Sequence, residues 1–82
     1  MPSPQQCAQR AAQQLYDSEI APCPRSPEWK GGARAGICKV FGLPHQSSPY
    51  TNGTAQDDAR RTGFLVGHTL ARDAQTTQGV PV

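Results

Sequence analysis

Large hydrophobic side chains are scarce in this chain of 82 residues. Valine, isoleucine, leucine, methionine and the aromatic residues contribute 16 positions, and the remaining hydrophobic residues are ten alanines and three cysteines. A chain of this length forms at most one domain, and a core of this size stabilises it by only a few kcal/mol. The composition therefore excludes a deep enzyme pocket enclosed within one copy of the chain, and it favours stabilisation by a partner.

Other features are also missing, and each absence narrows the possible functions. No apolar stretch approaches the roughly 20 residues that a membrane-spanning helix needs. The first residues lack the basic and apolar regions of a signal peptide. The three cysteines are an odd number and form no Cys-x-x-Cys pair, so a closed disulfide framework is not expected. We therefore expect a cytoplasmic protein that does not enter a membrane and carries no metal or other cofactor.

What the chain does contain is a set of helix signals. Three N-capping residues precede or open apolar patterns of helical period: Ser3 for residues 4–17, Ser26 for residues 27–42 and Thr54 for residues 54–73. The first helix has a thin apolar face and is the weakest of the three. Prolines at 22, 24 and 27 predict an extended connector before the second helix, and residues 74–82 are predicted to be a disordered tail.

Glycine pairs with a spacing of four residues mark the second and third helices. Gly32 and Gly36 share one helix face with Trp29, and Gly63 and Gly67 repeat the spacing in the third helix. Glycines four residues apart leave a flat strip on which another helix can approach closely. The predicted fold is all-α, with an N-terminal part (1–25) and an antiparallel two-helix hairpin (26–73) joined by a Pro/Ser/Gly loop over 43–53.

Three short motifs within residues 29–72 match one known pattern. These motifs are Gly32-Ala33-Arg34-Ala35-Gly36, Ser48-Pro49-Tyr50 and Gly63-Phe64. Together they resemble the small bacterial ribosome modulation factor family, whose corresponding elements are Gly-x-x-Ala-Gly, Cys-Pro-Tyr and a glycine beside an aromatic residue. The linker is longer here, and serine replaces the cysteine. The resemblance implies a two-helix regulator of translation that binds the ribosome or rRNA and holds the ribosome inactive.

Nearly all of the net charge of +2 lies in residues 25–42, where four basic residues stand against one acidic residue. RNA binding needs such cations because they displace counterions from the phosphates. The basic residues of this segment are predicted to form one stripe along the second helix. The candidates for contact with rRNA or with a protein partner are Arg25, Lys30, Arg34, Lys39, Tyr50, Arg60 and Arg61. Trp29 could stack on an unpaired base, but its place on the glycine face favours a core position.

Other functions remain open from the sequence. A protein–protein interaction module, such as a phage or mobile-element inhibitor of a host factor, would fit the same fold, and the chain could form a homo-oligomer. A small modifying enzyme would need Cys38 or a serine beside His45 or His68. Cys23, Cys38, His45 and His68 are the residue types that bind zinc, although their spacing matches no zinc motif. A Cys7–Cys23 disulfide would need an oxidising compartment.

Overall fold

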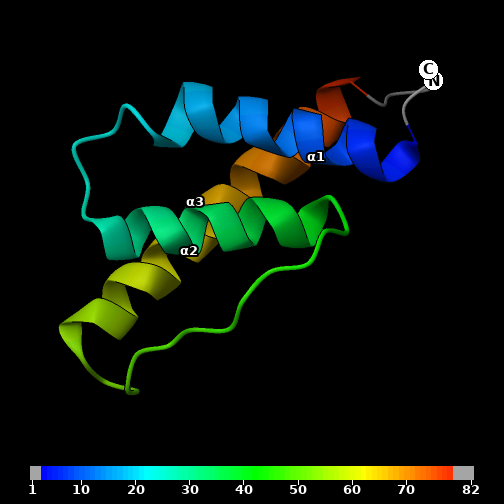
Figure 1. The fold of residues 1–82 in the computed structure, drawn as a ribbon. Helices are drawn as coiled ribbons and strands as arrows, with labels where there is room; N and C mark the ends of the chain where they lie inside the picture. The colour runs from blue at the N-terminus through cyan, green and yellow to red at the C-terminus, as the bar shows by residue number, and fades with distance from the viewer. Residues whose placement is uncertain (1–2, 79–82) are drawn as a thin grey trace.

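The computed structural model describes residues 3–78, and in these residues all regular structure is helical, with no strand. The elements are α1 (Pro4–Leu15), a short π-helical turn η1 (Tyr16–Ile20), α2 (Pro27–Val40) and α3 (Ala55–Gln78). They form an elongated body with extents of 42 × 21 × 20 Å (Figure 1). The predicted all-α class is confirmed.

The N-terminal helix begins as predicted and ends later. The hydroxyl of Ser3 accepts a hydrogen bond from the backbone N–H of Gln6 at 3.2 Å, and the Gln6 side chain accepts one from the N–H of Ser3 at 2.9 Å. The prediction ended this helix at residue 17, but η1 continues it to Ile20, whose side chain is fully buried. Burial of an isoleucine is worth about 1.5–3 kcal/mol, which favours the longer helix. The connector is therefore extended only over residues 24–26.

Helix α2 has well-defined ends. The backbone N–H of Trp29 donates to the hydroxyl of Ser26 at 3.2 Å, so the predicted cap is confirmed. The helix ends at Val40, two residues before the predicted end, and Gly42 follows with a φ of +71°. The N–H of Leu43 donates to the carbonyl of Cys38 at 2.8 Å. A left-handed glycine with this bond is the Schellman motif, which turns the chain away from the helix axis.

Helix α3 is longer than the sequence indicates. Its N-terminus is capped by the hydroxyl of Thr54, which accepts from the N–H of Asp57 at 3.2 Å. The predicted end at residue 73 is wrong, because the helix runs to Gln78. Gln75 explains part of this extension, since its amide donates to the carbonyl of Val40 at 3.5 Å and ties the last turns of α3 to the end of α2. The rest of the predicted tail, residues 79–82, lies outside the described residues.

The predicted antiparallel arrangement of α2 and α3 is wrong: the two helices cross while running in the same general direction (Figure 1). Four glycines meet the backbone of the opposite helix: Gly32 at Arg60, Gly36 at Phe64, Gly63 at Trp29 and Gly67 at Ala33. Residue numbers rise together in these pairs, which requires parallel chains. The predicted role of the glycines in close helix packing is confirmed, since a Cβ at any of the four would overlap backbone atoms of the other helix.

The segment 41–54 makes the parallel arrangement possible. Its 14 residues can span roughly 45 Å when extended, whereas the 14 residues of α2 are about 21 Å long. The segment returns along the helix pair to the start of α3 (Figure 1). Side chains of α3 hold it there: Arg60 donates to the carbonyl of Gln46 at 2.7 Å, and the hydroxyl of Ser48 donates to Asp57 at 3.2 Å. The antiparallel pair of consecutive helices in this fold is instead α1 and α2 (Figure 1).

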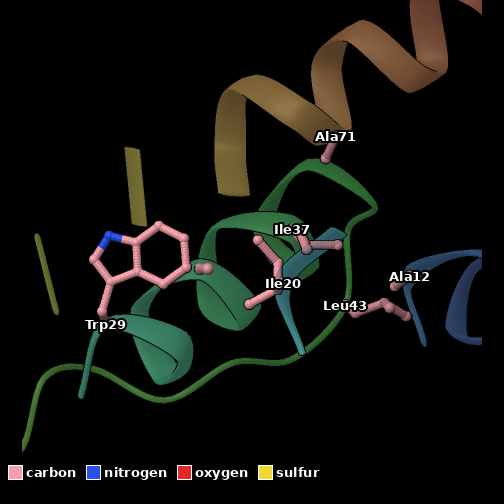
Figure 2. Close-up of a cluster of buried hydrophobic side chains, with 7 residues drawn as sticks. Ala12, Ile20, Trp29, Ile37, Leu43 and Ala71 are labelled. Atoms are coloured by element: carbon pink, nitrogen blue, oxygen red, sulfur yellow. The ribbon is translucent and has the colours of Figure 1, made fainter. Parts of the chain in front are cut away.

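The core lies where α1, η1, α2 and α3 meet. Figure 2 shows Ile20 and Ile37 at its centre, with Trp29 on one side and Leu43 and Ala12 on the other. Ile20 and Ile37 are fully buried, and Trp29 is 5% exposed. Leu43 brings the start of the segment 41–54 into the same cluster. The small core thus packs α2 against α1 and η1, against α3 and against the start of the segment 41–54.

Candidate nucleic-acid interface

The basic residues predicted to form one stripe along α2 lie on two different faces. Lys30 and Arg34, four residues apart, face α1 and η1. The ammonium of Lys30 donates to the carbonyl of Ala21 at 2.8 Å, and the guanidinium of Arg34 donates to the side chain of Gln13 at 2.8 Å. Lys39 faces α3 instead, with its Nζ 5.9 Å from the ring centre of Phe64.

Arg34 has a second contact with the N-terminal helix. Its guanidinium carbon lies 5.0 Å from the ring centre of Tyr16, which is cation–π distance. Together with the hydrogen bond to Gln13, this contact holds α1 and η1 against α2. Arg34 is nevertheless exposed, and one hydrogen bond uses only one of the five N–H donors of a guanidinium. Arg34 therefore both holds the fold together and presents free donors to solvent.

The two aromatic candidates lie in different environments. Trp29 belongs to the core, so the alternative in which it stacks on an RNA base is wrong. Arg25 covers its ring, with the guanidinium carbon 5.0 Å from the ring centre. Tyr50 is half-buried in the segment 41–54, where its backbone N–H donates to the hydroxyl of Ser48 at 3.2 Å. Tyr50 thus remains a candidate for stacking, and Trp29 does not.

Arg60 and Arg61 both hold the segment 41–54, but their charges differ in how they are balanced. The Nε of Arg61 lies 3.0 Å from Oδ2 of Asp57, whose side chain is 3% exposed, and its guanidinium donates to the side chain of Asn52 at 3.3 Å. Arg60 donates to a backbone carbonyl, which carries no net charge. In the part of the chain that the structure describes, Arg61 is therefore the arginine paired with a carboxylate.

The remaining basic candidates contact neutral groups. The partners are carbonyls, an amide and aromatic rings, and none of them cancels a positive charge; the residues concerned are Arg25, Lys30, Arg34, Lys39 and Arg60. These contacts fix the direction of each cation without neutralising it. Fixed cations lose less conformational entropy when an anion binds, because their side chains are already ordered.

A cleft of about 320 Å³ lies between α2, the segment 41–54 and α3. Arg34 of α2 and Arg60 of α3 both line it, and no acidic residue is among its lining residues. Gly31 and Ala35 form part of the α2 wall. A Cβ at Gly31 would lie 3.3 Å from Nη1 of Arg60, so this guanidinium lies against α2. The volume is at the lower end of the roughly 300–1,000 Å³ that ligand sites occupy.

Two further clefts adjoin this one. A cleft of about 390 Å³ between α1 and α2 shares Arg34 and Cys38 with it. A cleft of about 240 Å³ at the start of α3 shares His45 and Arg60 with it and adds Arg61 and its carboxylate partner Asp57. We call these three adjoining clefts the arginine trough. The trough follows the segment 41–54, and three of the predicted site residues line it, whereas Arg25, Lys30, Lys39 and Tyr50 do not.

Two residues that the sequence suggested only for zinc binding or catalysis belong to this surface. His45 and Cys38 both line the central cleft. The ring nitrogen Nδ1 of His45 lies 3.3 Å from the carbonyl of Leu43, so Nδ1 is the donor and Nε2 is left for another partner. The length of the 41–54 connection was the one signal for this arrangement, because antiparallel neighbouring helices are usually joined by only about 2–8 residues.

The zinc site and the Cys7–Cys23 disulfide considered from the sequence are not formed in residues 3–78. No three histidine, cysteine or acidic side chains gather there to hold a metal ion, so Cys23, Cys38, His45 and His68 make no zinc site. Cys7 and Cys23 are free and lie at opposite ends of α1 and η1, too far apart for a disulfide. Neither does any helix within these residues have the length and apolar character to cross a membrane.

Comparison with protein-family models, with curated proteins and with solved structures gives no match for this chain.

Proposed function

We propose that this chain is a small cytoplasmic regulator that binds the ribosome through rRNA and lowers translation. The observation that carries the proposal is the arginine trough, in which Arg34 and Arg60 present charges that no carboxylate of the described residues pairs with. The resemblance of residues 29–72 to the ribosome modulation factor family adds the choice of the ribosome as the RNA target.

The trough suits a single-stranded or looped RNA segment better than a regular duplex. It consists of three adjoining clefts of about 240–390 Å³ beside the segment 41–54. Single strands can fit a groove because their backbone bends and their bases separate. Tyr50 and the Nε2 of His45 would then contact a base or sugar near the trough, while the arginines contact phosphates.

The test is sedimentation of purified ribosomes with the protein at two salt concentrations. At about 50 mM salt, where phosphate contacts are strong, the protein should pellet with ribosomes, and at about 200 mM most of it should stay in the supernatant. An Arg60→Gln variant should pellet less at the lower salt concentration. Arg72→Gln removes the same charge from an exposed site that lines none of the clefts and serves as the matched control.

Two results would contradict the proposal. The protein could remain in the supernatant at the lower salt concentration, which would exclude binding dominated by phosphate contacts. The two variants could also lose binding equally, which would mean that net charge and not the trough governs the interaction. A translation assay with added protein gives the functional readout, and the expected result is reduced synthesis with the wild type and less reduction with Arg60→Gln.

A further inference from the structure

The central cleft of the arginine trough combines two cations from different helices around one small space. Arg34 stands on α2 and Arg60 on α3, and both line the same 320 Å³ cleft. The central cleft is lined by no acidic residue, and Asp57 in the adjoining cleft is paired with Arg61. The positive charges of Arg34 and Arg60 therefore favour an anion in the central cleft. A single phosphate group has enough oxygens to accept hydrogen bonds from both.

We infer that this cleft is a specific site for one phosphate group of the bound RNA, held jointly by Arg34 and Arg60; the inference rests on the proposed function. Gln13 and the carbonyl of Gln46 each accept one N–H from these arginines and orient them. The remaining N–H donors can therefore point at the phosphate without further ordering.

Cys38 offers a reporter within the natural sequence. It is half-buried on the wall of this cleft, whereas Cys7 is exposed on α1 and lines none of the three clefts. A phosphate group in the cleft would hinder the approach of an alkylating reagent to Cys38 and leave Cys7 unchanged. The ratio of the two alkylation rates, measured by mass spectrometry on the wild-type chain, therefore reports occupancy of the cleft without any substitution.

The first experiment measures this ratio with a short oligouridylate, with inorganic phosphate and with chloride at matched ionic strength. Both phosphate-containing probes should slow the alkylation of Cys38 several-fold relative to Cys7, and chloride should not. Equal rates with and without phosphate would overturn the inference. Protection by the oligouridylate alone would also overturn it, since the bulk of the RNA and not a phosphate in the cleft would then cover Cys38.

The second experiment asks whether Arg34 and Arg60 bind the same phosphate group. It measures the affinity for the oligouridylate in a double-mutant cycle with Arg34→Gln and Arg60→Gln. Each single variant should weaken binding about tenfold, the effect of losing one charge-assisted contact. The double variant should lose affinity by a smaller factor than the product of the two single losses, because both arginines bind the same phosphate group. Losses that multiply would mean separate phosphates and would overturn the joint site. Arg34 also anchors α1, so thermal unfolding of each variant is measured alongside.

These results separate the two proposals. Phosphate protection of Cys38 without ribosome pelleting would overturn the proposed function and leave the phosphate site intact. Ribosome pelleting with Cys38 unprotected would overturn the phosphate site and leave the function standing.

Discussion

Replacing Gly32 by alanine should destabilise the protein, whereas the same change at the neighbouring Gly31 should not. A Cβ at Gly32 would lie 2.8 Å from the carbonyl carbon of Arg60 and would overlap its oxygen, and backbone atoms cannot move aside. A Cβ at Gly31 would lie 3.3 Å from the guanidinium of Arg60, the far end of a flexible side chain. The two sites are adjacent in one helix and gain the same helix propensity.

The magnitudes follow from two opposing terms. Alanine in place of glycine inside a helix contributes about 1 kcal/mol. Overpacking a tight contact costs about 1–3 kcal/mol and more where backbone must shift. Gly32→Ala should therefore lower the free energy of unfolding by about 2 kcal/mol, or the Tm by roughly 10 °C for a domain of this size. Gly31→Ala should raise the stability by up to about 1 kcal/mol.

Thermal and urea unfolding followed by far-ultraviolet circular dichroism measures both variants. The diagnostic result is the opposite sign of the two shifts, because helix propensity alone would stabilise both. If Gly32→Ala proves as stable as the wild type, α2 and α3 do not approach at this residue, and the crossing described above is wrong.

Three further predictions concern the elements that support the trough, and urea unfolding measures each of them. Asp57→Ala should cost about 1–3 kcal/mol, because it leaves Ser48 without its acceptor; the neighbouring exposed Asp58→Ala should change stability by about 0.5 kcal/mol or less, and equal effects would refute a structural role for Asp57. Thr54→Ala should cost about 0.5–2 kcal/mol as the cap of α3 is lost, and an unchanged midpoint would count against that cap. Ile37→Ala should cost about 2–5 kcal/mol because Ile37 is fully buried; a cost under about 1 kcal/mol would place it outside the core.

Local features of the fold were predictable because they depend on neighbouring residues. The hydroxyls of Ser3, Ser26 and Thr54 cap the three helices as their positions in the sequence indicate. Gly42 ends α2 in the left-handed conformation that other residues avoid. The helix ends were less predictable. Burial of Ile20 and the contact of Gln75 with Val40 lengthen the first and third helices, whereas α2 ends two residues before its predicted end.

The direction of the helix pair was not predictable from the glycine spacing. A strip of glycines has no side chain whose direction distinguishes parallel from antiparallel packing, so it allows both. The choice depends on the segment 41–54 and its anchors, above all Arg60 and the Ser48–Asp57 hydrogen bond. Those contacts join residues nine to fourteen positions apart across an irregular segment, and no periodic pattern in the sequence predicts them.

The site was predictable only in its residue types. One error was avoidable: Lys39 follows Lys30 by nine residues, which is two and a half helical turns, so the two cannot share a face. The cleft itself depends on where the segment 41–54 lies. Only the tertiary structure shows that Arg34, His45 and Arg60 line the same cleft.

The salt dependence of RNA binding tests the central claim most directly. The affinity for a single-stranded oligoribonucleotide is measured over a series of salt concentrations for the wild type and for the Arg34→Gln/Arg60→Gln variant. If the two arginines neutralise one phosphate, the slope of log affinity against log salt should become shallower by about 0.7 in the variant. An unchanged slope would show that the RNA phosphates do not occupy the arginine trough.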